Sequence, residues 1–266
     1  MDKKVKDALG DRMKSNYENR SKTYLTRRVP CIIRLDGKAF HTFTKGFDRP
    51  WDIILHKAMV ETTKYLCENI QGCKIGYTQS DEITLLLTDF DTITTDAGFG
   101  YSVQKMCSIA ASMATLQFNR AFRTAINEAA ACKTLDKHTI ALMVARDKGA
   151  CFDARCFSVP KEEVNNCFVW RQQDATRNAI QMLGQAHFSH KQLEHKKTNQ
   201  IQDMLWKEKN INFNDMPIPF KRGTCVVRNT VLKNGVERHV WEADYNIPIF
   251  TKDRNYVEQY LGGEIS

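Results

Sequence analysis

Residues 34–41 read Arg-Leu-Asp-Gly-Lys-Ala-Phe-His, and they close an apolar run from Val29 to Leu35. A short apolar run followed by turn residues is typical of a buried strand. Asp36 and Gly37 stand at its end. A carboxylate in that position can bind a divalent metal, and the bare backbone of a glycine lets a phosphate come close. We therefore expect a functional site at the end of this strand.

A second acidic turn lies further along the chain. Lys74 to Thr78 and Ile83 to Leu87 each read as a strand, and the polar sequence Gln79-Ser80-Asp81-Glu82 joins them. This pattern predicts a hairpin with carboxylates at its tip.

Helices are predicted on both sides of this hairpin. Pro50-Trp51-Asp52 opens one that ends at Gln71-Gly72, and the stretch from Tyr101 to Ala131, which contains no proline or glycine, predicts a long second one. A further strand is expected at Thr139 to Ala145. The order is then β-α-β-β-α-β, which predicts a ferredoxin-like α+β sheet.

In this topology the end of the first strand and the hairpin tip lie at the same edge of the sheet. Asp36, Asp81 and Glu82 are therefore expected to converge. Each aspartate taken alone reads equally well as an ordinary turn residue. Together they are placed as oxygen ligands for two-metal nucleotidyl transfer would be.

The second half of the chain is predicted to decorate this sheet. Helices are expected over Val164 to Leu183 and Ser189 to Glu208, and a hairpin over Gly223 to Leu232 and Val236 to Ala243 with its turn at Asn234-Gly235. No repeat or linker divides the 266 residues, so we expect a single domain, with a sheet core at 1–150 and decoration at 151–266.

The polar and basic segment 1–28 is expected to dock on the body as a helix, with an apolar face formed by Ala8, Leu9, Met13 and Tyr17.

Bulk composition narrows the class of protein. The net charge of +8 and pI near 9.0 fit a polyanionic partner, but such a surplus is also common in proteins that bind no nucleic acid. The nine cysteines form no Cys-x-x-Cys pair and predict reduced thiols in the cytoplasm. No apolar run approaches the roughly 18 residues of a membrane span, and we expect neither export nor membrane insertion.

Basic residues after Asp36 suggest a phosphate cradle. Lys38, His41, Lys45 and Arg49 follow within one loop. Without the carboxylates this loop would read as solvated, whereas beside them a triphosphate cradle is favoured.

A second basic stretch contains His187, His190 and His195. Their spacing does not gather them on one helix face, so a zinc site is disfavoured. With Lys191, Lys196 and Lys197 they predict a basic surface, which could lie along RNA phosphates or could be idle.

Five motifs together resemble the tRNA(His) guanylyltransferase family. They are Arg34-Leu35-Asp36-Gly37-x-x-Phe40-His41, Gln79-Ser80-Asp81-Glu82, Phe152-Asp153-x-Arg155, Trp170-Arg171-Gln172-x-Asp174 and Lys221-Arg222-Gly223-Thr224. The resemblance implies a polymerase-like palm that extends the 5′ end of tRNA in the 3′-to-5′ direction. It also implies two Mg²⁺ ions, ATP or GTP as the activating nucleotide, and a homo-oligomer, in this family a tetramer.

The resemblance also implies roles for single residues. Asp36 and Asp81 would be side-chain metal ligands and catalytic residues, with Glu82 supporting them, and Gly37 would offer its carbonyl to a metal. Those implied to hold nucleotide are Asp36, Gly37, Lys38, Ala39, Phe40, His41, Arg49, Ser80 and Asp81. Those implied or expected to contact tRNA are Arg171, Asp174, Asn178, Lys196 and Lys197.

One motif departs from the family. Eukaryotic members carry His-Ile-Asn-Asn where this chain has Thr176-Arg177-Asn178-Ala179. The chain therefore looks more like the branch that repairs shortened tRNA 5′ ends by templated addition than like a strict tRNA(His) enzyme. A nucleotide cyclase or forward polymerase would share the carboxylates but not the later motifs. A non-catalytic RNA-binding module would need aromatic residues on its inner strands, and Glu82 to Leu87 has none.

Overall fold

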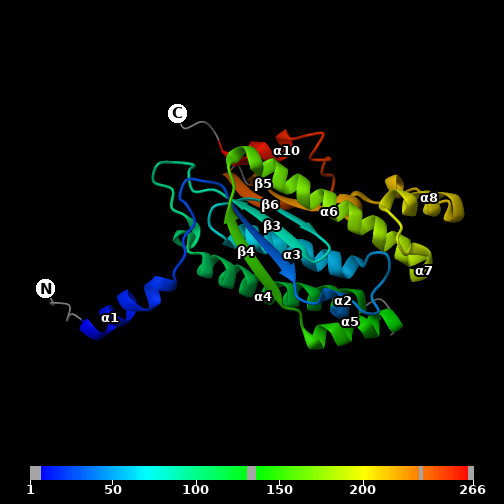
Figure 1. The fold of residues 1–266 in the computed structure, drawn as a ribbon, viewed down its shortest axis with the longest axis horizontal. Coiled ribbons are helices and arrows are strands. Elements are labelled where there is room, and N and C mark those ends of the chain that lie inside the picture. The colour runs from blue at the N-terminus through cyan, green and yellow to red at the C-terminus, as the bar shows by residue number, and fades with distance from the viewer. Residues whose placement is uncertain (1–6, 131–135, 234–235, 263–266) are drawn as a thin grey trace.

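A computed structural model describes residues 7–130, 136–233 and 236–262 (Figure 1). The strands are β1 (Cys31–Gly37), β2 (Cys73–Gln79), β3 (Glu82–Leu87), β4 (Phe152–Ser158), β5 (Thr224–Lys233) and β6 (Val236–Asp244). The helices are α1 (Ala8–Asn16), α2 (Phe40–Phe43), α3 (Ile53–Asn69), α4 (Val103–Ala130), α5 (Lys137–Lys148), α6 (Lys161–His187), α7 (His190–Leu193), α8 (Thr198–Lys209), α9 (Ile218–Arg222) and α10 (Asn255–Glu258).

The strands form one antiparallel sheet in the order β4-β1-β3-β2-β5-β6. Its first four strands, with α3 and α4 as the connecting helices, have the predicted ferredoxin-like order, and the α+β palm is confirmed. The register sets Asp36 of β1 opposite Glu82 of β3 on one side and opposite Asp153 of β4 on the other. Because directly paired residues leave the same face of a sheet, these three acids form a row.

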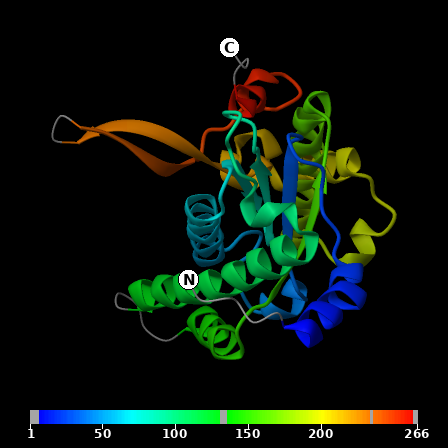
Figure 2. The same cartoon turned by 90° about the vertical axis from the view of Figure 1, so that its left-hand side faces the viewer.

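The two faces of the sheet carry separate apolar cores. Ile33 and Leu35 point toward α3 and α4, where they join a cluster that includes Phe118 and Phe122. Ile32, on the opposite face, packs with residues of α6 and of the C-terminal segment. Figures 1 and 2 show these two helical layers on either side of the sheet. The alternation along β1 is the period-two pattern of a strand buried on both faces.

The fourth core strand was placed wrongly by sequence. Residues Thr139 to Ala145 lie in helix α5, and the strand is β4, at Phe152–Ser158. The buried residues of α5 are Thr139, Leu142 and Ala145, spaced by three as on a helix face. Charged side chains alternate with apolar ones along β4, the period-two pattern of a half-exposed edge strand, which the placement of a strand at Thr139 to Ala145 passed over. The expected division at residue 150 thus leaves one core strand outside the core.

Among the other predicted helices and strands, several are present but with different bounds. The predicted helix over Ser189 to Glu208 is wrong as a single element, since α7 and α8 are separated by residues 194–197. The predicted C-terminal hairpin is confirmed as β5 and β6; it joins the sheet through β2 and projects from the body (Figure 2). Its turn residues Asn234-Gly235, and Ala131 at the end of the long helix, lie outside the described residues.

The N-terminal helix exists but does not dock as expected. None of the residues of α1 is buried, and Leu9, Met13 and Tyr17 are exposed. In the described ranges, no helix has both the length and the apolarity that a membrane crossing needs.

Candidate active site

The end of β1 meets the β2–β3 turn. The amide of Gly37 donates a hydrogen bond of 3.1 Å to the carbonyl of Asp81, which ties the two segments together. Ser80 takes a left-handed conformation, with φ of 49°, so that the turn reverses sharply. Asp36 and Asp81, which the sequence predicted to converge, therefore line one cavity.

The electrostatics of this pair favour a cation. Burial, and secondly the negative charge of Asp36, raise the pKa of Asp81. A carboxylate whose pKa is raised in part by a neighbouring negative charge is stabilised when a positive charge comes between the two. Carboxylate oxygens with a backbone carbonyl, here that of Gly37, are ligands that suit Mg²⁺.

A cavity of about 570 Å³ opens in front of these acids, and we call it the acidic cavity. Among the residues that line it are Asp36, Gly37, Ala39, Phe40, His41, Lys45, Arg49, Ser80 and Asp81. Lys38 is not part of the lining; its amide donates to the carbonyl of Cys151. Three basic side chains and four acidic ones, those of Asp36, Asp48, Asp52 and Asp81, thus line a space large enough for a nucleotide.

Phe40 and Gly37 also contribute to the packing of the core. Phe40 is buried and packs against Phe43, Phe118 and Phe152. A Cβ atom on Gly37 would lie 2.3 Å from the Phe40 ring. The glycine is therefore required for packing, whatever its carbonyl also does.

Glu82 lies beside the acidic pair without lining the acidic cavity. Arg171 of α6 donates two hydrogen bonds to its carboxylate, of 2.5 and 2.7 Å, and the side chains of both residues are buried. Burial raises the pKa of Glu82 even though Arg171 opposes the shift. The pair fixes the start of β3 next to Asp81.

The predicted tRNA residues of α6 are only partly accessible. Arg171 is 5 % exposed and also donates to Asp174 at 2.9 Å, so its guanidinium is not available to RNA in this conformation. Asp174 accepts a further bond from Arg177. Burial works against it, but the hydrogen bonds from Arg177 and Arg171 lower the pKa of Asp174. Asn178 lines a small pocket that shares Ser80 with the acidic cavity.

Comparison with known proteins now decides the family. Residues 10–160 of the 266 match the model described as tRNAHis guanylyltransferase (Thg1). The chain belongs to the Thg1 family. Its members are tRNA guanylyltransferases, so the chain is a nucleotidyltransferase, and this weighs against a non-catalytic RNA-binding module.

Individual Thg1 relatives agree with this assignment. An uncharacterized protein of Acanthamoeba polyphaga mimivirus, R259, is 28 % identical over 253 residues, covering 91 % of this chain and 85 % of that protein. The tRNA(His) guanylyltransferase of Saccharomyces cerevisiae is 26 % identical over 212 residues, covering 74 % of this chain and 81 % of that protein.

Solved Thg1 structures have the same fold. A bacterial Thg1-like protein in complex with ATP superimposes with a TM-score of 0.81 at 44 % identity, covering 96 % of this chain and 99 % of that one. Its complex with GTP gives a TM-score of 0.78 at 41 % identity, with the same coverage. The S. cerevisiae enzyme, at 22 % identity and a TM-score of 0.62, covering 90 % and 100 %, supports the fold alone.

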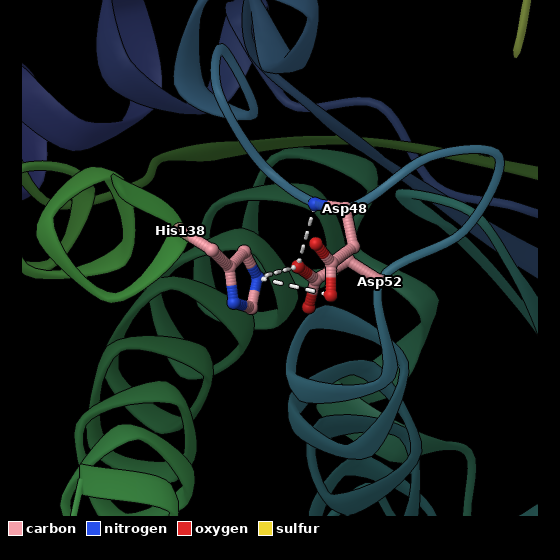
Figure 3. A group of neighbouring side chains, drawn as sticks. All are labelled: Asp48, Asp52 and His138. Atoms are coloured by element: carbon pink, nitrogen blue, oxygen red, sulfur yellow. Dashed lines mark hydrogen bonds and ion pairs between the residues drawn. The ribbon is translucent and has the colours of Figure 1, made fainter. Parts of the chain in front are cut away.

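This Thg1-family chain contains a further cluster of potential metal-ligand side chains, which the sequence analysis did not predict. The side chains of Asp48, Asp52 and His138 lie together (Figure 3), and they are the only group of three or more potential metal-ligand side chains in the described ranges. The two aspartates also line the acidic cavity. Nε2 of His138 lies 2.6 Å from Asp52 and 3.7 Å from Asp48. Asp52 also accepts from the amides of Leu55 and Asp48, so it already serves as the N-cap of α3. Its place before a helix is a sequence signal, whereas nothing in the sequence pointed to His138.

Two residues of the predicted basic stretch after α6, His190 and Lys196, line a cavity next to the acidic cavity. Lys196 lines an open cavity of about 450 Å³ together with Arg49 and Gln185, both of which also line the acidic cavity. Lys197 is exposed at the start of α8. The three histidines of this stretch form no metal-ligand group within the described residues.

Proposed function

We propose that this protein is a 3′-to-5′ nucleotidyltransferase that adds templated nucleotides to the 5′ end of truncated tRNA. The 5′-phosphate first attacks the α-phosphate of ATP, which forms an adenylylated end and releases pyrophosphate, and the 3′-hydroxyl of an incoming nucleotide then attacks the activated 5′-phosphate and expels AMP. The observation that carries this proposal is the convergence of Asp36 and Asp81 in one cavity that Lys45 and Arg49 also line. The attacking hydroxyl, the activated phosphate with its leaving group and the triphosphate can be brought together in this cavity.

The acidic side of the cavity fits two Mg²⁺ ions. Asp36, Asp81 and the carbonyl of Gly37 would hold them, and the raised pKa of Asp81 is the behaviour expected of a carboxylate pair built for cations. Mg²⁺ held by these residues would supply the positive charge that polarises the attacking hydroxyl and neutralises the phosphates. No side chain has to act as a general base. Glu82, held by Arg171, keeps Asp81 in position.

The basic side of the cavity fits a triphosphate. His41, Lys45 and Arg49 line it, and the solved complexes of the bacterial Thg1-like protein with ATP and with GTP support nucleotide binding at 44 % and 41 % identity. The guanidinium of Arg49 can bind phosphate oxygens in bidentate fashion. Arg49 also lines the cavity of Lys196, so tRNA phosphates and the activating nucleotide would meet at this residue.

Templated repair is favoured over dedicated tRNA(His) guanylylation by the segment at 176–179. Thr176 donates to the carbonyl of Lys221 at 3.1 Å, and Arg177 is paired with Asp174. Both side chains are engaged within the protein, and Asn178 is the one polar residue of this segment that lines the neighbouring pocket. Without a dedicated motif, pairing with the acceptor stem would position the incoming base.

The deciding assay compares two substrates. A tRNA other than tRNA(His), lacking its first nucleotide and labelled at the 5′ end, is incubated with ATP, Mg²⁺ and single nucleotides, beside full-length tRNA(His) with an adenosine opposite the position to be filled. We expect faster addition to the truncated tRNA, with CTP used opposite G and GTP opposite C. Faster unpaired addition of guanosine would assign the protein to strict tRNA(His) guanylylation instead. Extension of a 3′ end would indicate a forward polymerase, and cyclic nucleotide a cyclase.

The proposal also includes a cytoplasmic homo-oligomer, a tetramer as in the family resemblance. The cysteines in the described ranges are all free thiols, which suits a reducing compartment. Light scattering of the purified chain would test the tetramer.

A further inference from the structure

Two cysteine side chains face each other where helix α4 packs on strand β4. Sγ of Cys107 lies 3.6 Å from Sγ of Cys156, although 49 positions separate the two residues in the sequence. Both residues are half-buried free thiols. The sulfur of Cys156 also lies 3.9 Å from the carbonyl oxygen of Val103, at the start of α4. A movement of about 1.5 Å would bring the two sulfurs to the distance of a disulfide bond.

Neighbouring thiols show why this pair is different. Cys67 and Cys73 also lie together, but both are buried, so an oxidant in solution does not reach them. Cys31 lies near the half-buried pair and is itself fully buried. Cys151 is exposed and precedes β4. The pair on α4 and β4 therefore combines a close partner thiol with access from solvent.

The surroundings of the pair favour oxidation over metal binding. A structural zinc site needs four ligands, and a catalytic one needs three from the protein. In the part of the chain that the structure describes, no third histidine, cysteine or carboxylate completes a metal-ligand group with these two sulfurs. Two thiols without a third ligand are instead the minimum that a disulfide requires.

We propose that Cys107 and Cys156 form a disulfide when the protein meets a peroxide. The peroxide oxidises one thiol to a sulfenic acid, as its O–O bond breaks and one water leaves. The sulfur of the second thiol then attacks the sulfenic sulfur, the S–S bond forms, and a second water leaves. In total one peroxide is reduced, two thiols are oxidised, and their two hydrogen atoms end in water. A dithiol reductant reverses the change by thiol–disulfide exchange.

The chemistry of Cys156 makes this disulfide long-lived. Burial, and secondly the neighbouring Cys107 thiol, raise the pKa of Cys156 to about 12. A thiol with a high pKa is mostly protonated and attacks slowly, but its thiolate is also a poor leaving group. The bond therefore forms slowly and resists reduction once it has formed, as a structural link does.

The disulfide would clip an edge strand to a helix. Within the described sheet β4 pairs only with β1, and Asp153 of β4 lies opposite Asp36. An edge strand with one neighbour opens more readily than a central strand. A covalent bond from α4 would hold β4 closed beside a catalytic carboxylate. This response to oxidant does not depend on the proposed function.

Peptide mapping of the full chain tests the bond directly. Trypsin cleaves after lysine and arginine, which places Cys107 in peptide 106–120, Cys156 in peptide 156–161 and Cys151 in peptide 149–155. After treatment with hydrogen peroxide, peptides 106–120 and 156–161 should be recovered as one linked species, which dithiothreitol separates. The linked protein should melt roughly 4–8 °C above its reduced form.

Serine variants supply the controls, each compared with its own reduced form. Cys107→Ser and Cys156→Ser should both lose the linked species and the oxidant-induced rise in Tm. Cys151→Ser, which removes the exposed thiol nearby, should keep both. The proposal is overturned if peroxide leaves the wild-type peptides unlinked, if it links Cys156 to Cys31, or if it carries Cys107 to a sulfinic acid instead. An equal rise in Tm for Cys107→Ser would also overturn it.

Discussion

Replacing Arg171 by methionine should destabilise the protein strongly, because it leaves Glu82 charged and buried without its partner. The side chains of Arg171 and Glu82 are only 6 % and 11 % exposed, and two short hydrogen bonds join them. Removing one member of such a pair costs about 3–5 kcal/mol. For a chain of 266 residues this corresponds to a fall in Tm of roughly 6–10 °C, since each kcal/mol is worth about 2 °C.

The control lies about two turns away on the same helix. Arg177 pairs with Asp174 but is 56 % exposed, and Arg177→Met removes the same charge. An exposed pair contributes about 0–1 kcal/mol, so this variant should unfold near the wild-type denaturant concentration. Chemical denaturation of both variants gives the comparison, and the double variant Glu82→Gln/Arg171→Met should lose less stability than the sum of the single ones.

The loss caused by Arg171→Met should also depend on pH. Burial already raises the pKa of Glu82, and removing Arg171 raises that pKa further. A carboxyl whose folded-state pKa is raised favours the folded state below its unfolded pKa and loses that contribution as pH rises through the folded value. The destabilisation should therefore be largest near neutral pH and shrink on acidification. Equal stability of Arg171→Met and Arg177→Met at neutral pH would refute the buried-pair reasoning and return Arg171 to the tRNA surface.

Three further outcomes are expected. Asp36→Ala and Asp81→Ala should each reduce nucleotide addition by about 10²–10³-fold or more while tRNA binding persists, and near-normal turnover at saturating Mg²⁺ would contradict the metal assignment. Lys196→Ala/Lys197→Ala should weaken binding of all tRNAs alike and flatten its salt dependence, so an unchanged salt slope would remove these lysines from the RNA footprint. Gly37→Ala should cost about 1–3 kcal/mol in unfolding experiments because its Cβ would lie 2.3 Å from a buried ring, and wild-type stability would show that the ring can move.

Local signals were enough to predict most of the sheet. The apolar run of β1, the polar tip between β2 and β3 and the helix start at Asp52 each have a cause within a few residues, and all three are present in the structure. Because side chains alternate along a strand and the ferredoxin-like order fixes which strand ends share an edge, the convergence of Asp36 and Asp81 followed from the sequence.

Features that depend on contacts between residues far apart in the sequence were decided only by the tertiary structure. The spacing of apolar residues in a short segment is compatible with either a strand or a helix. Residues 137–148 form a helix, which packs against α4. The sequence predicted that Arg171 contacts tRNA, but in the structure this residue is buried and paired with Glu82. No sequence pattern indicated His138, whose contact with Asp52 is visible only in the structure. The cost of burying a charge without a partner depends on which distant groups surround it, and a linear pattern does not contain that information.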